Sequence, residues 1–267
     1  NVTPPEFFAP YRPEFAPLLA QGREELHELA SAFPESVGDS RWNADELAAA
    51  GFRAPGVLPI AVDPAVWDEP ADPEWMARLQ DGAPNLLFVG RIAPNKRQEH
   101  AIGLLAHLLA FAPRARLVLA GPERPDDPYA SCLRGLAARL GVADRVWLTG
   151  ELTPAQLQAC YRTAHLFVSC SEHEGFGVPL VEAMWFDVPV LAYRSTAVPE
   201  TLGEAGLLFT EKRWPELAAL AARLLRDDAL RARLRAAQRR RREAFRFSAL
   251  EPVYEAMLAR VFGAGAA

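Results

Sequence analysis

The sequence predicts an α/β fold in which helices cover both faces of a doubly wound parallel sheet. From residue 85 onward, short apolar runs of strand length alternate with longer segments that have helical spacing. The apolar runs are continuous, which is typical of strands that are buried on both faces. With 267 residues, half of them hydrophobic, the chain is long enough to bury such a sheet.

The expected elements follow one another as strand, helix, strand. Strands are predicted at 85–92, 115–121, 145–150, 166–171, 188–193 and 206–209, and helices at 96–111, 129–141, 153–164 and 178–185. Thr153, Pro154 and Gln156 have the spacing of a capping box at a helix start, and Gly141 marks a helix end. The pattern predicts one domain over residues 84–228.

Residues 1–62 predict only the tail end of a second α/β domain. Helices are expected near 22–32 and 44–50, and short strands near 35–38 and 57–60. Two short strands cannot enclose a core and leave an apolar edge open, so we expect a homodimer contact or a missing N-terminal segment to cover it. Residues 63–83, rich in proline and acids, predict an interdomain linker.

Composition excludes several function classes. The net charge of −5 argues against a general nucleic-acid binder. No apolar run is long enough to span a membrane, and Cys132, Cys160 and Cys170 lack metal or disulfide spacing, so we expect a cytoplasmic protein. Eight arginines between residues 231 and 246 leave two interpretations open. One is peripheral contact with the inner face of a membrane, and the other is a solvated helix face.

The segment "EHEGFGVPLVE", residues 172–182, predicts an anion site. Pro179 suits the first turn of a helix, so the loop of Gly175, Phe176 and Gly177 would end at a helix N-terminus. Free amides and the helix dipole attract an anion there, and glycines let the anion approach the backbone closely.

Two acids, Glu174 and Glu182, flank this loop and call for a separate role. Helical side chains lean toward the N-terminus, so Glu182 can reach back and accept hydrogen bonds from two ribose hydroxyls. Glu174 can face the group attached to the far phosphate. The alternative is a surface acid pair that interacts with the helix dipole.

A second motif, "GRIAPNK", places Arg91 and Lys96 around the turn after the first strand, with Lys96 expected to open the next helix. Two cations there fit a diphosphate, although ordinary solvated charges are the alternative. Both motifs lie at the carboxyl ends of strands, where doubly wound sheets bind ligands. A dinucleotide dehydrogenase is not supported, because no G-x-G-x-x-G follows the first strand.

Taken together, "GRIAPNK" and "EHEGFGVPLVEAM" resemble the family 4 retaining glycosyltransferases, and Glu174 and Glu182 match the E-x7-E pattern of that family. The resemblance implies a GT-B fold: a complete C-terminal nucleotide-sugar domain, the tail end of an N-terminal, Rossmann-like acceptor-side domain, and C-terminal helices over 229–267. The last helix is expected to cross back to the N-terminal part. Asp187, where the family often has glycine, and the sequence "RSTAV" before Pro199 depart from the pattern and leave the donor sugar open.

The resemblance also implies a role for each site residue. Arg91, Lys96 and Glu174 would be catalytic, the first two on the diphosphate and Glu174 at the donor sugar, while Glu182 would hold the ribose. The remaining donor-binding positions are the backbone amides of Phe176, Gly177 and Val178, the adjacent Gly175, and the glycines Gly90, Gly121 and Gly150 at strand ends. No cofactor or metal is expected, since no acidic cluster such as D-x-D is evident.

The expected activity is hexosyl transfer, with retention, from a nucleotide-diphospho-sugar to a sugar, lipid or small-molecule acceptor in polysaccharide, glycolipid or glycoconjugate synthesis. Two alternatives remain: a non-catalytic nucleotide-sugar-binding subunit with a separate partner, and an epimerase or phosphorylase-like enzyme on the same architecture. The sequence does not specify the base, the sugar or the linkage. We expect the chain alone to bind nucleotide but to transfer sugar poorly.

Overall fold

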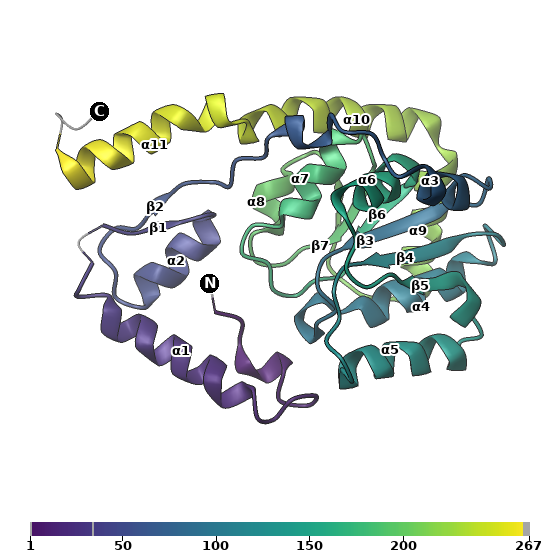
Figure 1. The fold of residues 1–267 in the computed structure, drawn as a ribbon, viewed down its shortest axis with the longest axis horizontal. Coiled ribbons are helices and arrows are strands. Elements are labelled where there is room, and N and C mark those ends of the chain that lie inside the picture. The colour runs from purple at the N-terminus through teal and green to yellow at the C-terminus, as the bar shows by residue number, and fades with distance from the viewer. Residues whose placement is uncertain (1, 34, 264–267) are drawn as a thin grey trace.

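The computed structural model describes residues 2–33 and 35–263, so the last four residues of the expected C-terminal segment lie outside the described residues. Figure 1 shows a large sheet domain and a smaller group of N-terminal elements, with the C-terminal helices running along both.

The helices are α1 (Ala16–Leu29), α2 (Arg41–Ala49), α3 (Pro73–Leu79), α4 (Gln98–Leu108), α5 (Pro128–Arg139), α6 (Pro154–Thr163), α7 (Val178–Trp185), α8 (Val198–Leu202), α9 (Trp214–Arg226), α10 (Asp228–Arg241) and α11 (Phe247–Phe262). The strands are β1 (Val37–Gly38), β2 (Gly56–Val57), β3 (Asn85–Val89), β4 (Arg116–Ala120), β5 (Val146–Leu148), β6 (Leu166–Ser169), β7 (Val190–Tyr193) and β8 (Leu207–Phe209). Short 3-10 turns are η1 (Pro5–Phe7), η2 (Pro64–Trp67), η3 (Pro94–Lys96), η4 (Ala143–Arg145) and η5 (Arg242–Phe245).

The main sheet has six parallel strands in the order β5-β4-β3-β6-β7-β8. Within this sheet, β3 lies in the middle, and β4 and β5 are added in turn on one side of it. The chain then crosses back and adds β6 on the other side of β3. This is the strand order of a doubly wound α/β domain, and it confirms the predicted fold class. The reversal of direction lies between β3 and β6.

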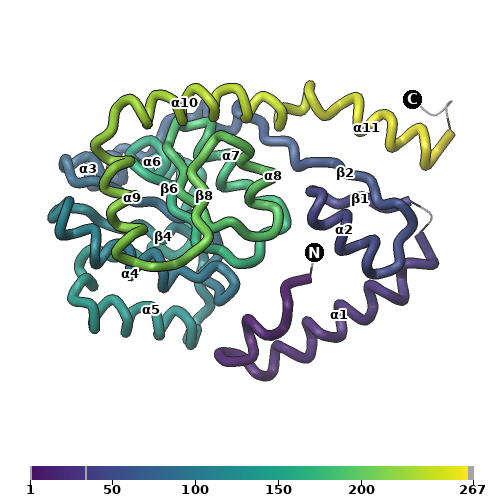
Figure 2. Tube along the Cα trace, turned by 180° about the vertical axis from the view of Figure 1, so that it is seen from behind, coloured from purple at the N-terminus to yellow at the C-terminus, as the bar shows by residue number. Residues whose placement is uncertain are grey.

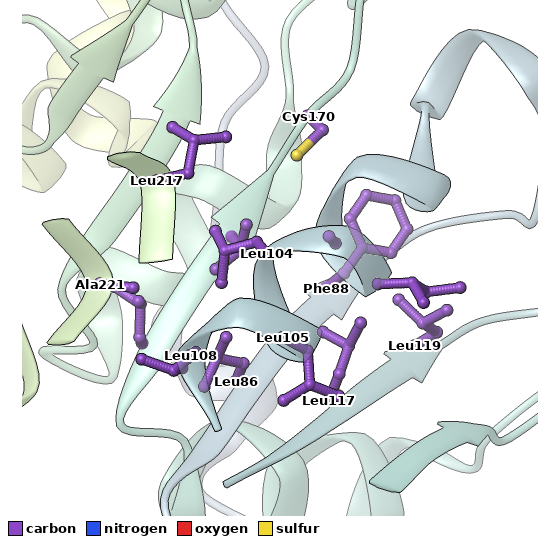
Figure 3. Packing of buried hydrophobic residues seen from close by; sticks show 14 of the residues in the cluster. Leu86, Phe88, Leu104, Leu105, Leu108, Leu117, Leu119, Cys170, Leu217 and Ala221 are labelled. Atoms are coloured by element: carbon purple, nitrogen blue, oxygen red, sulfur yellow. The ribbon is translucent and has the colours of Figure 1, made fainter. Parts of the chain in front are cut away.

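Each face of the sheet packs on its own layer of helices. Leu86 and Phe88 of β3 face one cluster, whereas Leu87 between them faces the other, because successive side chains of a strand point to opposite faces. Figure 3 shows Leu105 of α4 packed with strand leucines on the first face. Gly103 of α4 allows α9 to pack closely against α4, because a Cβ at that position would lie 2.2 Å from the ring of Trp214 at the start of α9. Burial on both faces explains the continuous apolar strands.

The N-terminal elements form a much thinner layer. β1 and β2 are parallel and pair over two residues each, with α1 and α2 packed beside them. α2 begins at Arg41, earlier than expected, because the Ser40 hydroxyl accepts a hydrogen bond from the Asn43 amide as an N-cap. α11 extends beside these elements in both views, and Arg260 lies 3.7 Å from Glu35 (Figures 1 and 2).

Residues 63–83, for which the sequence predicts a linker, are partly helical and attach to the sheet domain. α3 packs against α6, and the Asp72 amide donates to the carbonyl of Ala155 at 3.0 Å. Trp67 of η2 packs its ring against Tyr161 and Phe186. The segment is therefore attached to the helical layer that covers β3 and β4.

Most of the C-terminal arginines are engaged with the rest of the protein. Arg235 donates to the carbonyl of Asp187, and Arg242 donates to carbonyls at the end of α7. Asp187 has φ 54, which explains why glycine suits this position, and its carboxylate pairs with Arg239 and Arg242. The engaged arginines are thus neither a free anionic-membrane patch nor a fully solvated helix face. Among the described residues, no helix is both long and apolar enough to cross a membrane.

Candidate functional site

The candidate site lies where the strand order reverses, between the loops that follow β3 and β6. Because these strands are adjacent and parallel, their carboxyl ends meet at one edge of the sheet. There the Nζ atom of Lys96 lies 2.6 Å from Oε2 of Glu174, and each side chain is only 15% exposed. The fold thus brings together two predicted residues that are 78 positions apart in the sequence.

The loop after β3 differs from its prediction in one respect. Lys96 does not open α4, as the sequence suggested; it ends the short turn η3. Pro94 begins this turn, and Arg97 then adopts a left-handed conformation with φ 52 before α4 starts at Gln98. The prediction was wrong because a single left-handed residue separates the turn from the helix. Lys96 therefore projects from a turn beside Glu174.

A network of polar contacts fixes the two loops to each other. Asn95 is buried: its side-chain amide donates to the carbonyl of His173, and its own carbonyl accepts from the Glu172 amide. The Glu172 carboxylate pairs with Arg97 at 2.7 Å and with Lys212 at 2.6 Å. Burial alone raises the pKa of Glu172, but the hydrogen bonds from these cations outweigh burial and lower it. The charged carboxylate of Glu172 therefore holds the loop after β6 to the loop after β3.

The N-terminus of α7 offers free backbone donors. Gly177 is the N-cap with φ 86, and no side chain caps the helix. Within the described part of the chain, the amides of Phe176, Gly177 and Val178 donate to no other group. The loop carbonyls are tied instead, since Gly175 accepts from Ser40 Oγ and Phe176 accepts from Thr201 Oγ1, both at 2.6 Å. This arrangement can hold an anion at the helix start.

The side chain of Phe176 is not part of that anion site. It is buried in a small cluster with Val62, Val181 and Phe245, and its ring lies 5.4 Å from that of Phe245. The contact of its backbone amide with an anion stays a prediction, while its ring anchors the loop to the segment that holds Phe245. The side chain thus helps to fix the direction of the amides.

Glu182 lies one turn into α7 and is partly buried. The hydroxyl of Tyr161 donates a hydrogen bond to its Oε2 at 2.6 Å. Burial raises the pKa of Glu182, and the hydrogen bond from Tyr161 opposes that rise. Its contact with a ribose stays a prediction.

The three glycines at strand ends lie in one row. Gly121 forms an antiparallel bridge with Gly150, and a Cβ on Gly121 would lie 2.2 Å from the Gly90 oxygen. With φ 145 and 148, Gly90 and Gly121 adopt conformations that other residues rarely take. These glycines allow three strand ends to approach one another closely. Their contact with a base stays a prediction.

Arg91 lies at the rim of a hollow of about 160 Å³ between the loops after β3 and β4 and residues 8–15. Its side chain is exposed and forms no ion pair with any other described residue. A larger hollow of about 400 Å³ lies between α1, β1 and α2, and none of the predicted site residues lines it. No group of acidic, histidine or cysteine residues in the described part of the chain could hold a metal ion.

The structure adds residues to the site that the sequence did not assign to it. Ser40 and Thr196 bind the backbone of the loop after β6, and Lys212 holds Glu172. His173 is 5% exposed, burial and the neighbouring Lys96 lower its pKa to about 4, and its Nε2 has no partner among the described residues. Two of these residues lie in segments that the sequence analysis singled out: His173 in "EHEGFGVPLVE" and Thr196 in "RSTAV".

Comparisons with known proteins agree with this fold. The chain matches the model of "Glycosyl transferases group 1" over residues 74–241. It is 32% identical over 78% of its length to a D-inositol 3-phosphate glycosyltransferase of Streptomyces bingchenggensis, covering 48% of that protein. It is 33% identical over 70% of its length to a 2-deoxystreptamine glucosyltransferase of Streptomyces kanamyceticus, covering 49% of that protein. The chain thus spans about half the length of the curated relatives it matches.

Solved structures support the same architecture. Anabaena Alr3699/HepE, solved in complex with UDP and glucose, superposes with a TM-score of 0.79 at 22% identity, over 90% of this chain and 67% of that one. Sucrose-phosphate synthase of Thermosynechococcus elongatus gives a TM-score of 0.72 at 25% identity, over 86% of this chain and 58% of that one. The doubly wound sheet domain is thus that of a GT-B glycosyltransferase. With the family model matching more than half of its residues, the chain belongs to the group 1 glycosyl transferases.

Proposed function

We propose that this chain binds a nucleotide-diphospho-sugar at the reversal point of the sheet and transfers its hexosyl group with retention, as a family 4 enzyme of the GT-B fold. The observation that carries the proposal is the contact between Lys96 and Glu174, which joins the loops that follow β3 and β6. It stands at the carboxyl edge of the sheet, where such folds bind their ligands. Free amides at the start of α7 belong to the same loop.

The chemistry of these groups suits departure of a diphosphate. A leaving diphosphate gains negative charge as the sugar bond breaks, and oriented amides together with the cations of Arg91 and Lys96 stabilise that charge. Glu174 accepts a hydrogen bond from Lys96. In the proposed scheme its carboxylate lies beside the donor sugar. Glu182 accepts the ribose hydroxyls. In this scheme Glu174 and Glu182 are the two acids of the E-x7-E pattern.

The choice of first donor follows from the neighbours. Alr3699/HepE was solved with UDP and with UDP-glucose, which makes UDP-glucose the first donor to test. The named relatives suggest cyclitol and aminocyclitol acceptors as starting points, beside other sugars and lipids. We propose a division into residues 1–62 on the acceptor side, 63–83 as a connection, 84–228 for the donor, and C-terminal helices from 229.

One observation favours a second function. Among the described residues before the linker, the only strands are those of a two-stranded sheet, which is a small wall for holding an acceptor. A nucleotide-sugar-binding subunit that works with a separate partner would need no more than this. Both functions require donor binding, and only the first requires sugar transfer by the chain itself. Analysis of the products from radiolabelled UDP-glucose separates them and also detects an epimerase.

Donor binding is tested by calorimetry with UDP and uridine. Lys96→Ala and Arg91→Ala should each weaken UDP by about 10- to 100-fold, because each removes a charge-assisted contact to phosphate. Uridine affinity should barely change. Arg233→Ala, on the exposed side of α10, serves as the matched loss of a cation outside the site. Equal losses for UDP and uridine would remove both cations from the phosphate site, and loss of UDP binding on adding EDTA would require a metal.

Glu174→Gln separates binding from chemistry. The amide no longer neutralises Lys96, so UDP affinity should hold or rise, whereas transfer should fall by at least about 100-fold. A variant that transfers sugar at the wild-type rate would show that Glu174 has only a structural role.

A further inference from the structure

A tyrosine that the proposed chemistry does not use lies directly behind Glu182. Tyr161 of α6 has no exposed surface, and its hydroxyl lies 2.6 Å from Oε2 of Glu182. A second, longer contact of 3.4 Å joins the same hydroxyl to the carbonyl of Pro179. A carboxylate is the stronger acceptor, so the single hydroxyl proton is donated to Glu182.

The ring of Tyr161 is held on three sides. It stacks on Phe186 with centroids 5.1 Å apart and planes at 2°, and on Phe167 at 6.3 Å and 10°. The edge contact comes from Trp67, at 6.1 Å. Trp67 is itself fastened, since its carbonyl accepts a hydrogen bond from the buried side chain of Gln158. The hydroxyl therefore has a fixed direction, because the ring cannot turn without displacing its neighbours.

The protonation of this pair is also fixed. Burial raises the pKa of Tyr161 well above 10, and the negative charge of Glu182 raises it further. The tyrosine therefore remains a donor throughout the physiological range. Within the described residues, no group other than Tyr161 forms a hydrogen bond with the Glu182 carboxylate. One carboxylate oxygen is thus occupied from behind, while the other is available to a ligand.

We propose that Tyr161 is a positioning residue for nucleotide recognition: it fixes the carboxylate of Glu182 so that the free oxygen meets the ribose hydroxyls. This rests on the proposed function, in which Glu182 accepts those hydroxyls. The preorganised carboxylate does not have to give up rotational freedom when the ribose binds. Trp67, Phe167 and Phe186 act through Tyr161 by holding its ring in place.

The chain provides a matched control for the loss of this hydroxyl. Tyr129 of α5 is 1% exposed, and its hydroxyl donates to the carboxylate of Glu99 on α4. This second tyrosine–glutamate pair belongs to the cluster on the opposite face of the sheet. The same hydroxyl also accepts from the Gln98 amide at 2.8 Å. Tyr129→Phe therefore removes a buried tyrosine–glutamate hydrogen bond without touching Glu182.

The test is calorimetry with three ligands: UDP, 2′,3′-dideoxyuridine diphosphate and pyrophosphate. Tyr161→Phe should weaken UDP about tenfold, a fraction of what a direct charged hydrogen bond contributes. It should leave pyrophosphate unchanged, which also shows that the phosphate loop is still formed. The dideoxy ligand, which lacks both hydroxyls, should bind wild type and variant alike. Tyr129 lines the hollow at Arg91, so Tyr129→Phe should change any of the affinities by a common factor and leave the preference for UDP over the dideoxy ligand as in the wild type.

A double-mutant cycle supplies the second measurement. In a Glu182→Gln background, Tyr161→Phe should add less than about twofold, because its effect is transmitted through the carboxylate. Equal losses for UDP and pyrophosphate, or full additivity, would overturn the proposal and make Tyr161 a packing residue. If Glu182→Ala weakens UDP but Tyr161→Phe does not, only the positioning role is wrong. If Glu182→Ala changes nothing, the proposed role of Glu182 fails first.

Discussion

The sheet domain and the N-terminal elements contain the same kinds of helix and strand but are stabilised differently. In the sheet domain, six strands are covered on both faces, and side chains such as Leu105 and Leu117 have no exposed surface. In the N-terminal elements, α1 has no buried residue and Leu18 is 60% exposed. The first region therefore has its own hydrophobic core, whereas the second depends on contacts with its surroundings.

The contacts between the two regions are concentrated at the candidate site. Ser40, which caps α2, also donates to the carbonyl of Gly175. The ring of Phe7 lies under the guanidinium of Arg97 at 5.3 Å and faces His173 at 6.3 Å. The N-terminal elements therefore contact the loop after β6, which is the same loop whose amides are free to bind an anion. Ligand binding and the order of the N-terminal elements should be coupled.

The largest expected effect comes from a cavity in the sheet domain. Leu105→Ala removes a side chain with no exposed surface and should lower the free energy of unfolding by about 2–5 kcal/mol. The same change at Leu18 on α1 should cost about 0.5 kcal/mol or less. Urea unfolding followed by circular dichroism measures both. Similar losses for the two leucines would show that the N-terminal elements belong to the same core.

The contrast between the regions also explains what the sequence could predict. Buried strands such as β3 and β4 are continuous apolar runs, so their type and order follow from local pattern and the rules of parallel sheets. The capping box of α6 is a local motif and is present as predicted. The start of α2 was missed although its cap is local, since Ser40 accepts from the amide of Asn43 three residues further on.

The site was predictable only in part, for the same reason. The motifs gave Lys96 and Glu174, and the strand order brought their loops together. Tyr161 could not be found, because its link to Glu182 joins two helices through side-chain packing that no local pattern records. The left-handed turn at Arg97 was missed because arginine rarely adopts that conformation.

A second test uses pH to probe the contact between the regions at His173. Its pKa is about 4 in the folded protein, against an ordinary value of 6.5 that the unfolded chain should show, because burial and Lys96 disfavour the charged ring. Between these values the unfolded chain binds more protons, so stability rises with pH across the window and is lost as pH falls. Between pH 7 and pH 4.5, the contribution of His173 should lower the free energy of unfolding by about 2 kcal/mol.

Comparison with His173→Gln isolates this group, since glutamine does not titrate and the remaining histidines contribute equally to both proteins. Unfolding free energies measured at pH 7, 5.5 and 4.5 should show a shallower loss for the variant. If the wild type and the variant lose stability in parallel, His173 has an ordinary pKa in the folded protein. The contact between His173 and Phe7 would then be open in solution.

The smallest effect should come from the cap that joins the regions. The Arg41 amide, at the first position of α2, donates to both carboxylate oxygens of Glu200 on α8, at 3.0 and 2.8 Å. Glu200→Gln removes the charge at this helix start and should destabilise α2 by about 1 kcal/mol, the usual worth of a cap or of a charge on the helix dipole. Hydrogen exchange of the α2 amides should become about five times faster, while β3 and β6 keep their protection.

Asp127→Ala provides the matched control for that cap, because Asp127 accepts from two amides at the start of α5 entirely within the sheet domain. It should speed exchange in α5 and leave α2 unchanged. The two variants would then separate a cap that holds one region onto the other from a cap that holds a helix onto its own core.

If Glu200→Gln lowers protection equally in α2 and in β3, the two regions open as one cooperative unit, and the N-terminal elements share the stability of the sheet. If UDP slows exchange in α2 of the wild type and does so less in Glu200→Gln, the cap also transmits ligand binding from the loop after β6 to the N-terminal elements.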